Sequence, residues 1–301
     1  MLTVLCNSAT LQLCNPATFY PMPTPFDLVI LDLDGTIIDL YSPGGVAQEV
    51  LETIQLVQAA GVLVTIGTGR TLAYIRSHLS HLGVTTPVVS AMGAVIGDPV
   101  SGKVLEKNEV SHKSAHWVAQ WSTERQLVCG FYFCDEQGRF RIVQNFDGSK
   151  SQEFYDHVIT TPRQVGVDLA TTLVGTEANA PIKFLLVNDL NEGEDIAPHL
   201  RSVIGGDTTI VRTHPMLVEG TALGVDKGYG LRHLCKLLGI DIRRVLAIGD
   251  ADNDIPMLEA AGTAVAMGNA TPGVLAVADW VAPNVDQHGA AVAMRRFVLR
   301  E

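Results

Sequence analysis

The chain has 301 residues, of which 47% are hydrophobic and 18% charged, and its formal net charge is −11. This composition excludes a disordered chain and allows two domains, or one domain with an insertion. The acidic balance, without any run rich in Lys or Arg, disfavours nucleic acid and anionic membrane surfaces as partners.

The first 26 residues contain no Lys or Arg, and asparagines and prolines interrupt their apolar stretches. They lack the charged start and unbroken apolar run of a secretory signal, so we expect an N-terminal extension over residues 1–26. No stretch of the chain reaches the roughly 18 uncharged apolar residues that span a bilayer. The five cysteines have no metal-ligand spacing, which favours a reducing, cytoplasmic location.

The first predicted strand, Val29–Asp32, leads into two carboxylates, Asp32 and Asp34, two residues apart. Gly35 follows them and allows the chain to turn, so both carboxylates are expected where the strand gives way to a loop. At the carboxyl end of a buried parallel strand, such a pair faces the crevice where α/β folds bind ligands. One carboxylate can act as nucleophile and the other as general acid or base, and both can hold a hard cation.

Strand-like and helix-like runs alternate from Asp27 to about Met92. Short runs rich in β-branched residues predict buried strands, and apolar positions at helical spacing predict helices between them. The predicted elements are strands at Val29–Asp32, Val62–Gly67 and Val88–Ala91 and helices at Val46–Ala60 and Thr71–Leu82. This order is typical of an α/β fold with a doubly wound parallel sheet.

The middle of the chain, residues 108–221, has a different pattern, with one helix and two strands followed by a strand, a helix and two strands. Such an order predicts an α+β layer with an antiparallel sheet. The predicted strands are Leu127–Cys134, Arg139–Val143, Ile182–Val187, Thr208–Arg212 and Met216–Glu219, and the predicted helices are Lys113–Arg125, Gln152–Val158 and Glu194–Val203. Trp117 and Trp121, four residues apart on the first helix, are expected to pack in the core of this layer.

The α/β pattern resumes after residue 221. Its predicted helices are Gly228–Leu238, Asp254–Ala261 and Gly289–Val298, and its predicted strands are Val245–Gly249, Thr263–Met267 and Asp279–Val281. Three polar motifs now accompany the first Asp pair, each at a strand end or a helix start: Gly67-Thr68-Gly69-Arg70, Asp226-Lys227-Gly228 and Gly249-Asp250-Ala251-Asp252-Asn253-Asp254. Together they offer the hydroxyl or amide, the fixed cation and the metal-binding carboxylate that phosphoryl transfer needs.

With these four ordered motifs the sequence resembles the haloacid dehalogenase superfamily of aspartyl phosphohydrolases. The later stretch Val265-Ala266-Met267-Gly268-Asn269-Ala270-Thr271-Pro272 is similar to the Cof-type branch, subfamily IIB. The resemblance covers roughly residues 26–297. It implies a Rossmann-like core made of residues 27–107 and 222–301, with an inserted cap of type C2 at residues 108–221.

The resemblance assigns the carboxylates to distinct roles. Asp32 corresponds to the nucleophile that forms an aspartyl-phosphate, and Asp34 to the general acid/base. Asp32, the backbone carbonyl of Asp34 and the side chain of Asp250 correspond to the ligands of Mg²⁺. Asp254 corresponds to a partner just outside these ligands, acting directly or through water.

The same resemblance places five residues around the phosphate. The Thr68 hydroxyl and the Gly69 amide correspond to phosphate donors, and Lys227 to the cation that neutralises the nucleophile and the transferring group. Asn253 corresponds to a hydrogen-bonding partner of the phosphate or substrate. Two alternatives stay open for Arg70, which can reach the substrate or brace its loop by pairing with a carboxylate.

One position departs from the family pattern. Cof-type sequences usually carry Asn-Gly-Ala after the third strand, whereas this chain has Met92-Gly93-Ala94. Met92 replaces a polar side chain that could contact the substrate, so a substrate preference cannot be transferred from relatives on this motif.

The resemblance implies a Mg²⁺-dependent phosphatase that acts on a small organic phosphomonoester, such as a sugar phosphate or a related metabolite. A phosphomutase using the same aspartyl-phosphate chemistry is an alternative. The Lys and Arg side chains between positions 108 and 221 are scattered along the sequence, which disfavours this alternative. A non-catalytic binding module on this fold is a third reading. We expect a monomer or a homodimer.

Overall fold

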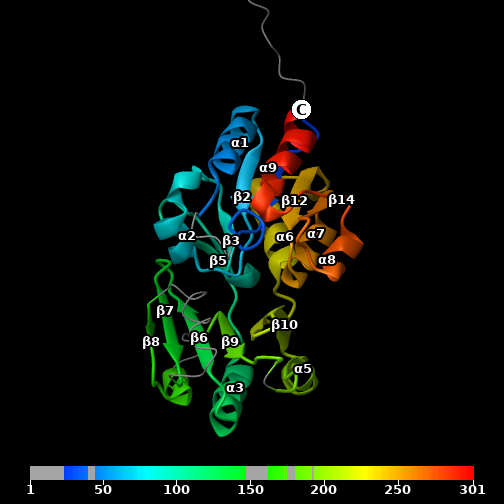
Figure 1. Ribbon diagram of the computed structural model, residues 1–301. Coiled ribbons are helices and arrows are strands. Elements are labelled where there is room, and N and C mark those ends of the chain that lie inside the picture. Colours follow the sequence, from blue (N-terminus) through cyan, green and yellow to red (C-terminus); the bar gives the residue numbers. More distant parts are fainter. Residues whose placement is uncertain (1–23, 40–44, 147–161, 175–179, 192) are drawn as a thin grey trace, which may run out of the picture.

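The computed structural model describes residues 24–39, 45–146, 162–174, 180–191 and 193–301 (Figure 1). Its upper half in this view holds a parallel sheet between helices, and its lower half holds an antiparallel sheet with helices at the far end. No helix in the described ranges is long and apolar enough to cross a membrane.

The parallel sheet has five strands in the order β14–β13–β12–β1–β2. Their bounds are β1 Leu28–Leu31, β2 Leu63–Ile66, β12 Val245–Gly249, β13 Thr263–Ala266 and β14 Trp280–Val281. β1 pairs in parallel with β2 on one side and with β12 on the other, although β12 is far away in the sequence. The chain therefore reverses its strand order beside β1, and the carboxyl ends of β1 and β12 flank the crevice expected at such a switch point.

Alternate residues of β1 face opposite layers of helices. Val29 and Leu31 belong to the hydrophobic cluster of α1 and α9, whereas Leu28 and Ile30 belong to the cluster of α6, α7 and α8. The helices of this half are α1 Gln48–Ala59, α2 Leu72–His78, α6 Lys227–Leu238, α7 Ile255–Ala260, α8 Pro272–Val277 and α9 Gly289–Met294. The predicted doubly wound α/β core is confirmed.

The third predicted strand, Val88–Ala91, forms as β3, but its pairing partner differs from the expectation. β3 (Val88–Ser90) joins the parallel sheet through one isolated bridge, between Gly67 and Val89. It pairs instead with β4 (Val95–Gly97), and β4 with β5 (Val104–Lys107), in a small antiparallel sheet. The turn from β3 into β4 has positive φ angles at consecutive residues, including Met92. This reversal is a local backbone event without a periodic signal, so the sequence pattern missed it.

The sheet of the lower half has the order β10–β11–β9–β6–β7–β8 and is antiparallel except for the parallel pair of β7 and β8. Its strands are β6 Cys129–Cys134, β7 Phe140–Gln144, β8 Arg163–Gln164, β9 Lys183–Val187, β10 Thr208–His214 and β11 Leu217–Ala222. Helices α3 (His112–Glu124) and α5 (Ala197–Ile204) lie at the end that points away from the parallel sheet (Figure 1). We call this unit the cap; its boundaries at residues 108 and 221 remain a prediction.

The two tryptophans of α3 pack in the interior of the cap, as their spacing of four residues predicts. Trp121 is buried and Trp117 packs against the same cluster, with their rings stacked 5.3 Å apart, as expected for core residues. The helix predicted at Gln152–Val158 lies outside the described residues.

Candidate active site

Two carboxylates meet where neighbouring parallel strands end. Asp32 follows β1 and Asp250 follows β12, and the two strands pair in register up to Leu31 and Ile248. The Thr36 hydroxyl donates a 2.9 Å hydrogen bond to Asp250, which ties the two strand ends together. Gly35, which precedes Thr36 in the turn after β1, has a φ of +86°, and a Cβ there would overlap the Asp250 carboxylate. Both the turn and the close approach require glycine.

Lys227 joins two of the buried carboxylates. Its ammonium donates to Asp32 Oδ1 at 2.7 Å and to Asp254 Oδ1 at 2.6 Å, and it is fully buried. Asp226 caps α6 by accepting from the Tyr229 amide at 2.7 Å, so Lys227 is the first residue of the helix. The N-cap thereby fixes the point from which the lysine side chain enters the site.

Asp254 anchors the loop after β12. Its Oδ2 accepts from the backbone amides of Asp250 and Ala251 at 2.9 and 3.0 Å, while Oδ1 receives Lys227. Asp254 is fully buried, whereas Asp252 is exposed and accepts a hydrogen bond from the Thr271 hydroxyl at 2.5 Å. Asp254 corresponds by resemblance to a partner just outside the metal ligands. In the structure it binds both the Lys227 ammonium and two backbone amides.

The clustered carboxylates disfavour one another's charge. Burial and repulsion from Asp254 raise the pKa of Asp32 well above its usual value, although Lys227 opposes this. Burial and Asp254 also raise the pKa of Asp250 from 3.8 to about 7, despite the Thr36 hydrogen bond. For Lys227, burial favours a lower pKa, but the carboxylates of Asp254 and Asp32 outweigh it and raise the pKa.

This donor set fits a hard divalent cation. One ligand atom from each of Asp32, Asp250 and Asp254 lies within 4.8 Å of the others. All of them are carboxylate oxygens, the type that Mg²⁺ and Ca²⁺ take. A cation at this point would also relieve the repulsion that raises the carboxyl pKa values.

We expect a pH-dependent stability from Asp250 in metal-free protein. Its folded-state pKa of about 7 lies above the unfolded value of 3.8, so the folded state binds the extra proton and loses stability as pH rises from about 4 to 7. Asp250→Asn removes this penalty. Because Asp250 keeps some exposed surface, we expect a gain on the order of 1–2 kcal/mol at pH 8, vanishing near pH 4.

Denaturant unfolding of metal-free Asp250→Asn and wild-type protein at pH 4.5 and pH 8 measures this difference. Asp252→Asn, which changes an exposed carboxylate in the same loop, is the matched control. An advantage of Asp250→Asn that is equal at both pH values would contradict the expectation.

Arg70 pairs with the predicted acid/base. Its Nε and Nη2 each donate to one oxygen of Asp34 at 2.8 Å, and its guanidinium lies 4.5 Å from the centre of the Tyr74 ring. Of the two alternatives for Arg70, this geometry is the bracing one. A substrate contact remains a prediction.

The loop after β2 is held in a defined conformation. Thr68 donates its amide to the Val89 carbonyl at 2.9 Å and accepts the Met92 amide at 3.0 Å. Its side-chain oxygen accepts from the Arg70 amide at 3.1 Å. No acceptor for its hydroxyl hydrogen lies among the described residues, so that hydrogen can bind an anion, as the predicted phosphate role of Thr68 and Gly69 requires.

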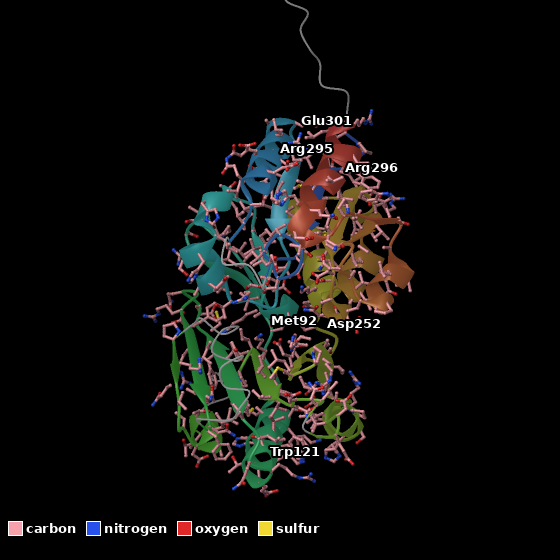
Figure 2. All side chains as sticks on the ribbon, viewed as in Figure 1. Met92, Trp121, Asp252, Arg295, Arg296 and Glu301 are labelled. Carbon is pink, nitrogen blue, oxygen red and sulfur yellow. The ribbon has the colours of Figure 1, made fainter. Side chains whose placement is uncertain are left out.

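Asn253 and Met92 meet beside this loop. The Asn253 Nδ2 lies 3.4 Å from the Met92 sulfur, and its buried Oδ1 has no hydrogen-bond partner among the described residues. Figure 2 shows Met92 and Asp252 at the junction between the core and the cap. The amide of Asn253 thus keeps hydrogen-bonding capacity where the predicted substrate would lie.

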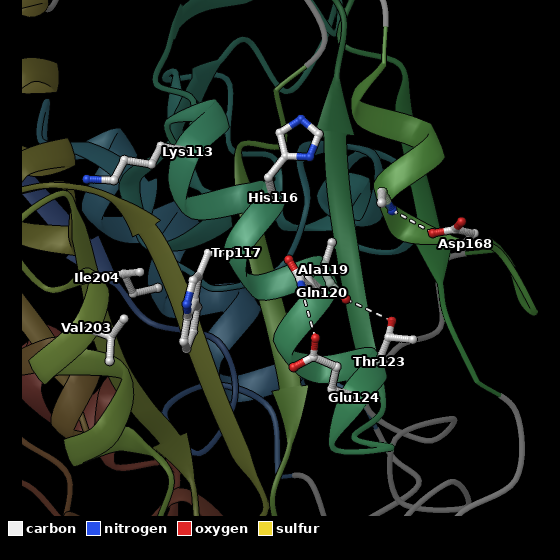
Figure 3. Close-up of a pocket in the computed structure, with 11 residues that line it drawn as sticks. Lys113, His116, Trp117, Ala119, Gln120, Thr123, Glu124, Asp168, Val203 and Ile204 are labelled. Carbon is white, nitrogen blue, oxygen red and sulfur yellow. Dashed lines mark hydrogen bonds between the residues drawn. The ribbon is translucent and has the colours of Figure 1, made fainter.

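A separate cavity of about 590 Å³ lies in the cap, between α3, α5 and the 3₁₀ turn Leu169–Leu173 (Figure 3). Trp117, Val203 and Ile204 form its apolar wall, and His116 and Glu124 lie at its polar side. None of the predicted site residues lines it. The predicted chemistry is therefore not located in this cavity.

The sequence reasoning missed two supporting residues and one cap residue. Thr36 binds Asp250, and Asn269 donates to the Gly35 carbonyl at 2.8 Å. Asn269 lies inside the quoted stretch Val265–Pro272, and Thr36 directly follows Gly35, so their positions could have pointed to them. Lys183 of the cap donates to the Gly69 carbonyl at 3.0 Å, and no motif around it signalled this contact.

The fold and this site are those expected of a phosphoryl-transfer type of hydrolase, and comparison with known families agrees. The profile of haloacid dehalogenase-like hydrolases matches residues 29–294. The chain belongs to that family, and the predicted enzyme class, a phosphoric monoester hydrolase, is confirmed.

Similar proteins cover nearly the whole chain. Phosphatase YwpJ of Bacillus subtilis is 28% identical over an alignment of 286 residues that covers 90% of this chain and 99% of that protein. A phosphoglycolate phosphatase of Methanopyrus kandleri is 28% identical over an alignment of 277 residues that covers 90% of this chain and 97% of that protein. Among solved structures, a subclass IIB sugar phosphatase, BT4131, superposes with a TM-score of 0.76 at 23% identity, over 90% of this chain and 98% of that one.

Proposed function

We propose that this protein is a Mg²⁺-dependent phosphatase that hydrolyses a small organic phosphomonoester, such as a sugar phosphate, through an aspartyl-phosphate on Asp32. The observation that carries the proposal is the buried Lys227 held between Asp32 and Asp254, because it places a fixed cation directly beside a carboxylate at a strand end. The phosphatase names of the relatives favour transfer to water over a mutase reaction.

The chain's own residues account for the steps. Asp32 attacks phosphorus, the bond to the leaving oxygen breaks, and Asp34 gives that oxygen a proton. Asp34 then takes a proton from water, which attacks the aspartyl-phosphate, so that inorganic phosphate leaves and Asp32 is restored. Lys227 neutralises Asp32 and the phosphoryl oxygens, which otherwise repel each other.

In this proposal Asp32, the Asp34 carbonyl and Asp250 hold Mg²⁺, with Asp254 behind them. When bound, the ion supplies positive charge that stabilises the phosphoryl oxygens in the transition state. Thr68, Gly69 and Asn253 orient the phosphate through hydrogen bonds, and Arg70 positions the Asp34 carboxylate through its two hydrogen bonds.

Phosphate release across a panel of sugar phosphates, nucleotides, phosphoglycolate and cofactor phosphates tests the proposal. We expect turnover of at least one class of small monoester. Absence of phosphate release from every member, by folded protein with Mg²⁺ present, would contradict it.

Removal of metal should silence the enzyme. We expect no turnover after chelation, recovery on adding Mg²⁺, and inhibition by excess Ca²⁺, because Ca²⁺ takes more oxygen ligands with looser geometry and can engage both oxygens of Asp32. Steady-state phosphate release in chelator-treated buffer with each metal added back measures this. Full activity in a metal-free sample would overturn the metal assignment of Asp34 and Asp250.

A further inference from the structure

Four side chains form a row across the face of the cap sheet, one from each of four adjacent strands. Tyr132 on β6 and Lys183 on β9 are directly paired in the antiparallel register. Glu219 on β11 lies diagonally from Lys183, since Thr221 is the residue opposite it. Thr213, in the irregular part of β10, completes the row. We call these four residues the cap row.

The cap row is joined by contacts and ends on the core. The Lys183 ammonium donates to the Glu219 carboxylate and, at 3.0 Å, to the Gly69 carbonyl of the core. It also lies 4.6 Å from the centre of the Tyr132 ring. Glu219 uses its other oxygen to accept from the Thr213 hydroxyl at 2.9 Å. Lys183 and Glu219 are 3% and 7% exposed, so this ion pair is shielded from water.

The contact with Gly69 fixes one peptide unit of the loop after β2. Lys183 holds the carbonyl of the Gly69–Arg70 peptide, and the amide of the same peptide donates to the Thr68 side chain at 3.1 Å. The orientation of that peptide therefore sets where the Thr68 hydroxyl points. A side chain of the cap thus binds a core loop that is 114 positions away in the sequence.

Stability alone is a poor explanation for this arrangement. A buried ion pair loses about as much in desolvation as it gains in attraction, and apolar residues often replace it without loss. Direct recognition of a substrate is also a poor explanation, because Glu219, Gly69 and the Tyr132 ring already surround the ammonium. What the pair does provide is a donor at a fixed position against the loop.

We propose that Lys183, held by Glu219, is a positioning residue that orders the loop Thr68–Arg70 for phosphate when the cap lies against the core. This inference rests on the proposed function, in which the loop binds the phosphate. It predicts that loss of Lys183 weakens phosphate binding equally for every substrate, since all substrates share the phosphate and differ only in the leaving group.

The test uses Lys183→Met together with Lys183→Met/Glu219→Gln. The single variant leaves the Glu219 carboxylate buried without its cation and is expected to be destabilised. The double variant removes both charges and should recover thermal stability close to that of the wild type. We expect kcat/KM of the double variant to stay roughly 10- to 100-fold below wild type, because a small misplacement of a binding group has effects of this size.

Three measurements on the full-length double variant decide the matter. The factor lost in kcat/KM should be the same for a sugar phosphate and for p-nitrophenyl phosphate. The inhibition constant of inorganic phosphate should rise by a similar factor. Amide hydrogen exchange of residues 67–71, measured without any ligand, should be faster than in wild type.

Lys107→Met is the matched control, because Lys107 also forms two ion pairs, with Glu109 and Glu136. It should leave all three measurements unchanged. Recovery of both stability and kcat/KM in the double variant would overturn the proposal and leave only a structural role. A loss that depends on the leaving group, with unchanged phosphate inhibition, would also overturn it. If wild-type protein releases no phosphate, the proposed function fails. The positioning role is refuted separately if amide exchange at residues 67–71 is the same in the double variant as in the wild type.

Discussion

Replacing Asp32 with asparagine is expected to lower phosphate-release turnover by a factor of about 10⁴ or more, because a neutral amide cannot form the aspartyl-phosphate. The fold should survive. Burial and the neighbouring Asp254 raise the pKa of Asp32, so its charge is costly in the folded state. Removing that charge while Lys227 keeps Asp254 as a partner should leave the melting temperature unchanged or a few degrees higher.

Turnover and melting temperature are measured on the same preparation, which separates lost chemistry from lost structure. Asp252→Asn serves as the control, since this exposed carboxylate lies near the site but has no role in the proposed chemistry. It should retain near-normal turnover. Wild-type turnover by Asp32→Asn would show that the covalent mechanism is wrong.

Replacing Lys227 with methionine should damage both activity and stability. The ammonium is the cation that Asp32 and Asp254 share inside the protein. Its removal leaves two buried carboxylates without their counter-ion, which costs about 3–5 kcal/mol of unfolding free energy. The carboxylates can regain neutrality by taking up protons, so we expect the loss to be smaller at pH 5 than at pH 8.

Denaturant unfolding with chelator at both pH values gives this difference. Lys236→Met, on the exposed face of the same helix α6, is the control and should change stability by no more than about 0.5 kcal/mol. Added Mg²⁺ should partly restore the stability of Lys227→Met, because it supplies another positive charge beside Asp32. A stability equal to that of wild type would contradict the role of Lys227 as the shared counter-ion.

Local patterns in the sequence were enough to predict the elements of the parallel-sheet core and the positions of the polar motifs. The buried strand β1 and the carboxylates after it were predictable because four consecutive apolar residues end at a polar turn. The helix α6 was predictable because Asp226 starts it and Gly239, with a φ of 68°, ends it. These signals depend on a few neighbouring residues, so they can be recognised without knowledge of the fold.

Less regular elements were missed for an equally local reason. β4 and β5 contain three and four residues, too few to show a period. The helix Pro272–Val277 has only six residues, although Thr271 caps it through the Val274 amide. Short segments take their structure from their neighbours in space, and composition alone does not reveal those neighbours.

The sequence by itself determined the family and the class of fold and predicted which residues carry the chemistry, because each motif is a short run with a defined turn or helix start. Only the tertiary structure decided which groups are partners. Lys227 meets Asp32 from 195 positions away, and Lys183 meets Gly69 from 114. Such pairings arise when the parallel sheet and the cap sheet bring distant segments together, and no local pattern records a contact between segments that far apart.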